Sequence, residues 1–274
     1  MKPAAFHYHV PRSVDDAVGL LHKYSSLEGR VLAGGQSLVP AMAMRLAMPA
    51  HLIDINEIAA LRTLEAENGY LRIGAGVRHS AFERPVVAGP LGELLAAVVR
   101  HIAHYPIRTR GTFCGSIAHA DPASEWCLVA ATLGAQIVAM STRGTRSIAA
   151  ADFFHGVMST ALVPDELLAE VRLPLLPDGA RFGFCEYSRR AGDFALATAL
   201  VARGAETHIG VGGAEARPRR IREAEAAFAR GSIDGAAEAA ARAVDPLMDA
   251  RYTADYRRDL VRTVVRRALE QASS

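Results

Sequence analysis

The sequence predicts an α+β fold in which short strands and helices alternate and a C-terminal β-sheet is backed by helices. Asn68-Gly69 lies between two strand-like runs, which is a strong hairpin signal. Glycine-bearing loops follow apolar, strand-like segments, and the last fifty residues are alanine-rich with helical periodicity. At 274 residues the chain exceeds a typical single domain. We predict a first domain over residues 1–176, with subdomains of about 1–57 and 58–176, and a C-terminal domain over residues 177–274.

Composition excludes several classes of protein. Half of the residues are apolar, 22% are charged, and the net charge of +2 is too small to indicate nucleic-acid binding. No signal-peptide core is visible at the N-terminus, and no apolar run reaches the roughly 18 residues of a membrane span. The three cysteines lack metal or disulfide spacing and fit a reducing cytoplasm. The histidines do not form a metal set either, so we predict a cytoplasmic protein without a metal site.

The first sixty residues predict a small unit of alternating strands and helices. A strand within residues 1–10 precedes a helix that Ser13 caps, with two aspartates in its first turn. A strand over residues 31–33 runs into the glycine loop VLAGGQSL, which is followed by a helical stretch over 38–48 and a strand over 51–55. This order places Gly34 and Gly35 where the chain leaves a strand, a place that suits ligand contact.

The middle of the chain is richer in strands. The hairpin over residues 64–73 precedes a helix over about 92–102, and the segment RGTFCGSIAHADPASE, residues 110–125, is predicted to be turn-rich. A helix from about residue 123 to 133 and strands over 136–140, 146–149 and 167–173 follow. Pro174 and the Pro177-Asp178-Gly179 sequence mark the domain boundary.

The C-terminal part reads as a sheet followed by helices. Strands are predicted over residues 181–188, 193–203 and 206–210, with Gly212-Gly213 and the basic turn ARPRRIR after them. In the last helix, apolar side chains from Leu260 to Leu269 share one face, and arginines lie mostly opposite. The pattern predicts a sheet backed by helices.

The two glycine loops favour an anionic ligand. Turns rich in small residues expose several backbone N–H groups and have no Cβ in the way, which is what a diphosphate requires. Two such loops in one chain suggest the two sides of one ligand. Asp121 and Glu125 lie in or before the first turn of the following helix, where acidic groups suit the helix dipole and also ribose hydroxyls. Either loop alone is equally consistent with a surface turn, and neither has the GxGxxG spacing of a nicotinamide site.

With both loops placed, the chain resembles the FAD-binding medium subunit of the molybdenum hydroxylases, the carbon monoxide dehydrogenase and xanthine dehydrogenase family. The likeness spans essentially the whole chain. It rests on ordered motifs: KPAAFHYHVPRS, AGGQSLVPAMAMRLAMPAHLIDIN, RIGAGVRHSAFE, RGTFCGSIAHADPASE, PDELLAEVRLP, FCEYSRRAGDFALA and GVGGAEARPRR. The resemblance implies an FAD-binding domain of the vanillyl-alcohol oxidase/p-cresol methylhydroxylase type, followed by a small C-terminal domain.

The resemblance also implies two sets of residues that hold the FAD pyrophosphate. The first set is Leu32, Ala33, Gly34, Gly35, Gln36, Ser37 and Leu38. The second set is Gly111, Thr112, Cys114, Gly115, Ser116 and Ala118, with His119 near the adenosine. Glu125 corresponds to an aspartate that bonds the adenosine ribose in relatives, and Asp121 either touches the ligand or stabilises the turn.

Further positions match residues near the flavin in relatives. Ile102, Leu162 and Leu168 match apolar positions that pack on the flavin, although ordinary core packing explains them equally well. Glu186 lies where relatives have a lysine or glutamate near the ring system, and Phe194 where they have an aromatic side chain. Cys114 replaces a usual glycine, so it is strained if that position needs a positive φ; a redox thiol is the alternative to a small buried side chain.

The function that the resemblance implies is electron transfer within a complex. Substrate is oxidised at a molybdenum cofactor in a large subunit, electrons pass through [2Fe–2S] clusters in a small subunit, and non-covalently bound FAD in this chain delivers them to NAD, a quinone or oxygen. An (αβγ)2 assembly is implied, and no catalytic residues are expected here. Two alternatives stay open: a stand-alone FAD-dependent oxidoreductase of the same fold, and a flavin-free assembly module.

Overall fold

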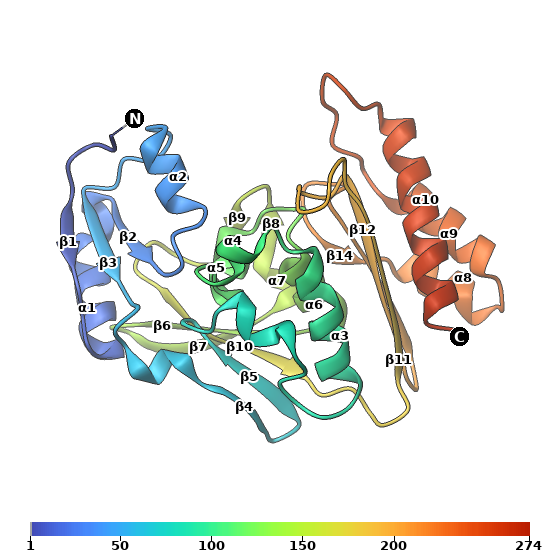
Figure 1. Cartoon of the computed structure of the whole chain (residues 1–274), viewed down its shortest axis with the longest axis horizontal. Coiled ribbons are helices and arrows are strands. Elements are labelled where there is room, and N and C mark those ends of the chain that lie inside the picture. The colour runs from blue at the N-terminus through green and yellow to red at the C-terminus, as the bar shows by residue number, and fades with distance from the viewer. Residues whose placement is uncertain (1) are drawn as a thin grey trace.

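The computed structural model describes residues 2–274. Three sheets succeed one another from the N-terminal to the C-terminal side of the molecule (Figure 1). They are a three-stranded parallel sheet, a five-stranded antiparallel sheet and a four-stranded antiparallel sheet, and a two-stranded ribbon accompanies them. Among residues 2–274, no helix has both the length and the apolar character needed to cross a bilayer. The α+β prediction is confirmed.

The N-terminal unit is built on the sheet β1-β3-β2. Ser13 caps the first helix as predicted, because its Oγ accepts a hydrogen bond of 3.0 Å from the Asp16 N–H. Strand β2 leads directly into the first glycine loop, and α2 follows that loop. The elements are β1 (His7–His9), α1 (Val14–Tyr24), η1 (Ser25–Leu27), β2 (Gly29–Leu32), α2 (Leu38–Ala43), β3 (His51–Asp54) and η2 (Ala59–Arg62).

The central sheet has the strand order β4-β5-β10-β6-β7. The predicted hairpin is confirmed: β4 and β5 pair around Asn68 and Gly69, whose φ angles of 50° and 81° suit a primed turn. Its strands are β4 (Leu64–Glu67), β5 (Tyr70–Gly74), β6 (Gln136–Ser141), β7 (Gly144–Ala149) and β10 (Leu167–Pro174).

Short helices lie between β5 and β6, and they carry the second glycine loop. They are η3 (His79–Glu83), α3 (Pro90–Val98), η4 (Val99–His101), α4 (Tyr105–Arg108), α5 (Phe113–His119) and α6 (Glu125–Leu133). Helix α7 (Ala150–Phe153) and the ribbon of β8 (Phe154–Gly156) and β9 (Ser159–Thr160) follow β7. Every residue of α6 is buried, because the helix packs both on the central sheet and on the C-terminal sheet.

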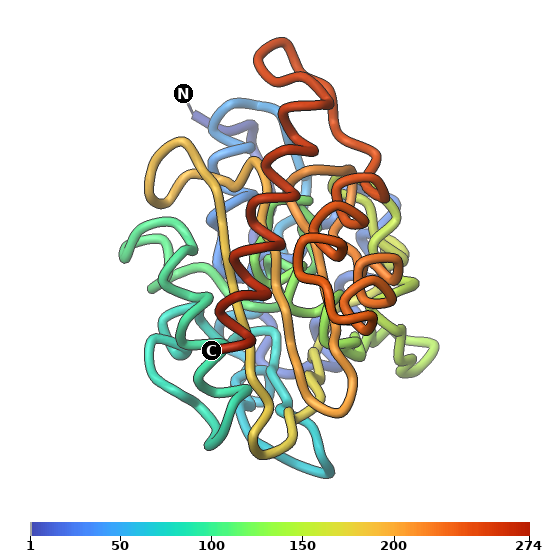
Figure 2. The backbone as a smooth tube through the Cα atoms, turned by 90° about the vertical axis from the view of Figure 1, so that its right-hand side faces the viewer, coloured from blue at the N-terminus to red at the C-terminus, as the bar shows by residue number. Residues whose placement is uncertain are grey.

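The C-terminal sheet is covered on both faces. Its strands are β11 (Arg181–Tyr187), β12 (Ala197–Arg203), β13 (Thr207–Gly212) and β14 (Arg219–Arg220). The inner face packs on α6 and α3, and the outer face packs on α8 (Arg222–Ala229) and α10 (Ala254–Gln271). Helix α9 (Ile233–Ala243) packs on α8 and α10, and these C-terminal helices lie in front of the sheet in Figure 2. A Cβ at Gly210 would lie 1.8 Å from Thr132 Oγ1, so the glycines of the GVGG motif permit close approach of α6.

Three sequence expectations are wrong in detail. Residues 113–119 form helix α5 within the segment predicted to be turn-rich: Thr112 caps the helix, and Phe113 and Ile117, four residues apart, face the core. Helix α2 ends at Ala43 because Arg45 adopts a left-handed φ of 58° and the Leu46 N–H bonds the Ala41 carbonyl, a Schellman-type ending. The strand expected from residue 193 begins at Ala197, after an irregular loop.

Candidate functional site

The two glycine loops lie against each other. A Cβ added to Gly34 would lie 2.4 Å from the Arg110 carbonyl oxygen and 2.6 Å from the Gly111 Cα atom. Any side chain at residue 34 would therefore push the loops apart, since a real Cβ does not approach backbone atoms so closely. The structure brings together the two loops that are far apart in the sequence, as the hypothesis of one shared ligand requires.

The first loop presents backbone donors. Gly35 has a left-handed φ of 72°, a conformation that favours glycine. Within residues 2–274, the N–H groups of Gly34, Gly35, Gln36 and Ser37 donate no hydrogen bond to another protein group. The Gln36 side chain instead bonds the Gly34 carbonyl at 2.9 Å and braces the loop. Successive free N–H groups in such a turn carry partial positive charge, which suits a phosphate.

The second loop is closed by its own cap and is buried over residues 111–114, while Gly115 and Ser116 are half-buried. Thr112 Oγ1 accepts a hydrogen bond of 3.0 Å from the Gly115 N–H, so this threonine caps α5. A Cβ at Gly115 would lie 2.6 Å from that oxygen, which explains the glycine. Cys114 is 2% exposed and its thiol bonds the Ile73 carbonyl at 3.3 Å.

Cys114 is compatible with its position. It is helical rather than left-handed, so no backbone strain follows from the replacement of glycine. Burial raises the pKa of the Cys114 thiol far above its ordinary value. A thiol that stays protonated is a poor nucleophile, and the geometry favours the small buried side chain over the redox thiol.

Behind the second loop lies a histidine that the sequence did not single out. His79 Nδ1 accepts a hydrogen bond of 2.9 Å from the Trp126 indole N–H. A Cβ at Gly111 would lie 2.5 Å from His79 Nε2, so this glycine too allows close packing. Burial, with smaller contributions from Arg78 and Arg108, lowers the pKa of His79 to about 4. The ring is therefore neutral near pH 7, and it forms part of a rigid wall behind the loop.

A chain of hydrogen bonds joins the two loops. Asn56 Nδ2 donates to the Ala33 carbonyl at 2.9 Å, and Arg78 Nη2 donates to Asn56 Oδ1 at 2.5 Å. Arg78 Nη1 donates to the carbonyl of Arg110. Sequence reasoning missed these residues, although both stand in motifs that carry the family resemblance: Asn56 ends LIDIN, and Arg78 lies within RIGAGVRHSAFE.

Three carboxyl groups lie near one another, two of them before or in α6 and the third on β11. Asp121 Oδ1 accepts from the Ala123 N–H at 2.9 Å and stabilises the turn, one of the two roles expected for it. Glu125, 6% exposed, stands in the first turn of α6, where burial and then Asp121 raise its pKa to about 7. Glu186 on β11 has a buried Oε2 without a hydrogen-bond partner, and burial and then Glu125 raise its pKa to about 8.

The remaining residues that are expected to contact the FAD differ in their burial. Ile102 and Leu168 are buried members of the core, and Leu162 is half-buried against it. At the end of α5, Ala118 is exposed and His119 is half-buried. Phe194 is 64% exposed, so it does not belong to the core in the way that Ile102 and Leu168 do.

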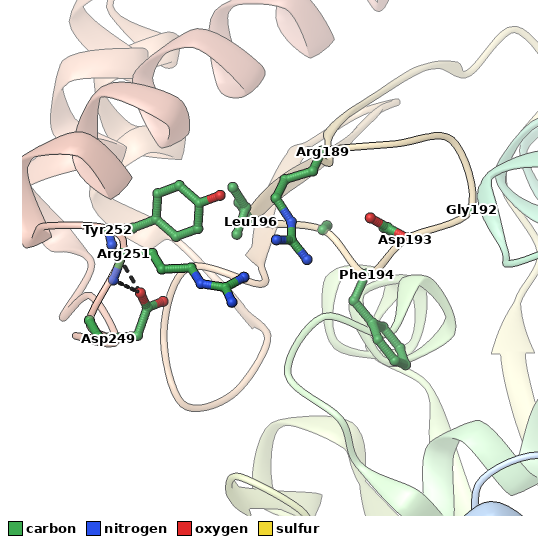
Figure 3. A pocket seen from close by; sticks show the side chains of 10 residues that line it. Arg189, Gly192, Asp193, Phe194, Leu196, Asp249, Arg251 and Tyr252 are labelled. Carbon is green, nitrogen blue, oxygen red and sulfur yellow. Dashed lines mark hydrogen bonds between the residues drawn. The ribbon is translucent and has the colours of Figure 1, made fainter.

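A cavity of about 660 Å³ opens beside Phe194, between residues 189–196 and residues 249–252 (Figure 3). The guanidinium groups of Arg189 and Arg251 point toward each other across it, and the Phe194 ring points away from them. Buried Arg257 fixes both walls, because it donates to the Leu196 carbonyl at 3.2 Å and to Asp249 at 2.7 Å. A Cβ at Gly192 would lie 2.6 Å from the His104 ring, so this loop touches the residue that precedes α4.

Comparison with known protein families accounts for almost the whole chain. Residues 4–176 match the family described as the FAD binding domain in molybdopterin dehydrogenase. Residues 182–272 match the CO dehydrogenase flavoprotein C-terminal domain.

Individual relatives agree with these matches. The chain is 41% identical to the nicotine 6-hydroxylase medium subunit of Paenarthrobacter nicotinovorans, over 82% of this chain and 80% of that protein. It is 38% identical to the carbon monoxide dehydrogenase medium chain of Hydrogenophaga pseudoflava, over 73% of this chain and 70% of that protein.

Among solved structures, a chain of the carbon monoxide dehydrogenase from Hydrogenophaga pseudoflava that lacks the Mo-pyranopterin moiety superimposes with a TM-score of 0.93. It is 35% identical, and the match covers 100% of this chain and 99% of that one. Quinoline 2-oxidoreductase from Pseudomonas putida 86 gives a TM-score of 0.90 at 32% identity, covering 100% of this chain and 99% of that chain. The chain belongs to the family of FAD-binding medium subunits of the molybdenum hydroxylases and is an oxidoreductase subunit.

Proposed function

We propose that the two glycine loops hold the diphosphate of a non-covalently bound FAD between them. The observation that carries the proposal is the contact of Gly34 with the backbone of Arg110 and Gly111, next to N–H groups that have no partner in the described chain. Of the site residues expected from the sequence, those within residues 32–38 and 111–118 belong to these two loops. When bound, a flavin can take up electrons one at a time and pass them on singly or in pairs, and the protein places it.

We infer that the chain works in a complex with a large molybdenum-cofactor subunit and a small [2Fe–2S] subunit, in an (αβγ)2 assembly in the cytoplasm. Relatives named as medium subunits of nicotine hydroxylase and carbon monoxide dehydrogenase support the complex. Three free cysteines support the reducing compartment. Electrons from the small subunit would reach this FAD and leave to NAD, a quinone or oxygen. The cavity beside Phe194 offers one route by which an acceptor approaches.

The experiment uses the chain in its native assembly. An affinity tag on the C-terminal residue, in the organism that encodes the chain, should recover two further polypeptides, molybdenum, iron and one FAD per chain. A chain that retains FAD but brings no molybdenum or iron would indicate the stand-alone oxidoreductase. A folded chain that brings partners but no flavin would indicate the assembly module.

The mode of attachment is tested on the same preparation. Acid precipitation should release the flavin into the supernatant, because a non-covalent cofactor leaves the protein when the fold is lost. Yellow colour that stays in the pellet would instead require a covalent bond to the chain.

A further inference from the structure

We propose that Arg78 is a positioning residue that ties the two glycine loops together and supplies the positive charge by which the site selects a flavin diphosphate, as in FAD, over a flavin without phosphate. The inference rests on the proposed function. It assigns a specificity role to a side chain that lies outside both glycine loops.

The positioning role follows from the hydrogen bonds of one guanidinium. One of its nitrogens reaches the second loop at the Arg110 carbonyl, and the other reaches Asn56 at 2.5 Å. Asn56 passes the connection to the first loop at the Ala33 carbonyl, 2.9 Å away. The amide of Asn56 is fixed in orientation, because its Nδ2 also donates to Asp54. The two loops come from different sheets, and this series of hydrogen bonds sets the distance between them.

The charge role follows from what Arg78 lacks. It is half-buried, yet no carboxylate lies within ion-pair distance of it among residues 2–274. Its partners are a carbonyl and an amide, both neutral. Asp54, the nearby acid, instead accepts hydrogen bonds from the Tyr8 hydroxyl and from Asn56. Burial and the charges of Arg110 and Arg62 lower the pKa of Arg78, which shows that positive charge gathers at this junction.

Asp54 favours the charged form of Arg78, but it lies beyond ion-pair distance and compensates this half-buried cation only in part. A bound anion would offset the remaining cost. The free N–H groups of Gly34 to Ser37 lie on the loop that Arg78 braces through Asn56, so backbone donors and side-chain charge act on the same space. A diphosphate carries the charge that this space lacks. Riboflavin has the same ring system and no charge, so it gains nothing from Arg78.

The test compares Arg78→Gln with the matched control Arg62→Gln in the full-length chain. Arg62 is an exposed arginine of the same cluster whose guanidinium bonds the Asn56 carbonyl and neither glycine loop. Dissociation constants for FAD and for riboflavin are measured by flavin fluorescence at two salt concentrations, with melting temperatures as a check of folding. For Arg78→Gln we expect the Kd of FAD to rise roughly 10- to 100-fold, because a charge-assisted contact is lost.

The selectivity ratio separates this role from a structural one. A merely loosened fold would weaken FAD and riboflavin equally, whereas we expect the Kd of riboflavin to stay nearly constant and the salt dependence of FAD binding to fall. Equal weakening of both flavins, or an equal effect of Arg62→Gln, would overturn the inference. Wild-type protein that binds no flavin would instead overturn the proposed function itself.

Arg78→Lys keeps the inference testable if Arg78→Gln does not fold. Lysine keeps the charge but, as a point donor, cannot span both loops in the manner of a guanidinium. We expect its salt dependence to match the wild type and its Kd for FAD to lie between those of wild type and Arg78→Gln. Wild-type affinity in Arg78→Lys would rule out the positioning role.

Discussion

The two glycine loops share a composition and differ in the use of their backbone. In the first loop the N–H groups of Gly34 to Ser37 have no partner within the described chain. In the second loop Thr112 already occupies the N–H of Gly115, and α5 continues from it. The first loop thus offers four successive N–H groups without a partner within residues 2–274. The second, capped by its own threonine, offers only those of Thr112 and Cys114 and is mainly a pre-formed wall. Glycine-rich sequence alone does not distinguish these two roles.

The two glycine loops also differ in burial. Residues 31–36 are half-buried and Ser37 is exposed, whereas Gly111, Thr112, Phe113 and Cys114 are all buried. The Phe113 ring lies 4.8 Å from the Trp126 ring, centroid to centroid, so the second loop is anchored in the aromatic core. Substitutions in the first loop should therefore change flavin affinity, and substitutions in the second should change stability first.

The largest effect should come from Gly34→Ala. The added Cβ would lie 2.4 Å from a backbone oxygen of the other loop, and neither backbone can yield without separating the loops. We expect the variant to lose FAD on gel filtration while far-UV circular dichroism stays close to wild type. Gly19→Ala is the matched control, because a Cβ there meets no atom within 4 Å. FAD retention by Gly34→Ala would show that the contact between the loops is not required.

The next largest effect should come from the protonation of Glu186 on β11, whose neighbour Glu125 ends the segment that carries the second glycine loop. Glu186 has a pKa of about 8 in the folded protein, raised by burial and then by Glu125, against an ordinary value of 4.5. The folded state holds this proton more tightly than the unfolded state, so stability is full below about pH 4.5 and falls as pH rises towards 8.

Glu186→Gln, a neutral side chain of the same shape, should remove that part of the pH dependence. At pH 8 we expect its melting temperature to exceed that of the wild type by about 5 °C, with the gap closing near pH 5. Exposed Glu270 gives the control Glu270→Gln. A gap that is the same at both pH values would contradict a buried, proton-holding Glu186.

A smaller effect should follow from removal of the cap of α5. Thr112→Val keeps the shape of the side chain and deletes the oxygen that accepts from Gly115, which costs about 1 kcal/mol of unfolding free energy. Thr112→Ser keeps the oxygen and should lie much closer to wild type. Urea unfolding compares the three proteins. Equal midpoints for valine and threonine would show that the second loop is not held by its cap.

The sequence was informative where local chemistry decides the structure. The Ser13 cap, the Asn68-Gly69 hairpin and the last amphipathic helix depend on neighbouring residues, and all three are confirmed. Helix α5 was missed because it has only seven residues and its small side chains favour turns in isolation. Its burial against Phe82 and Trp126 stabilises the helix, and that packing joins distant parts of the chain.

Parts of the candidate site could likewise be predicted from the sequence, and other parts could not. The glycine loops are visible as motifs, and their meeting in space agrees with the expectation that they share one ligand. The residue types of Arg78 and Asn56 do not mark them as site residues. In a sequence, this arginine cannot be told from an ordinary surface arginine, nor this asparagine from an ordinary turn asparagine. Their role arises only when strands from two sheets bring residues 33, 56, 78 and 110 together. Ligand contact by all the site residues expected from the sequence, Glu125, Leu162 and Phe194 among them, stays a prediction.

An effect on stability no larger than that of Thr112→Val should come from Cys114, and it sharpens the contrast between the loops. Cys114→Ala removes a buried sulfur and its hydrogen bond to the Ile73 carbonyl, so we expect a loss of about 1 kcal/mol in unfolding free energy. The Kd of FAD should be unchanged, because the side chain faces the core and the helical backbone tolerates alanine. Cys185→Ala, at the half-buried cysteine of β11, is the control, because this cysteine belongs to neither glycine loop. If Cys114→Ala alone weakened FAD binding tenfold, the thiol would belong to the ligand site, and the second loop would not be the inert wall that its burial indicates.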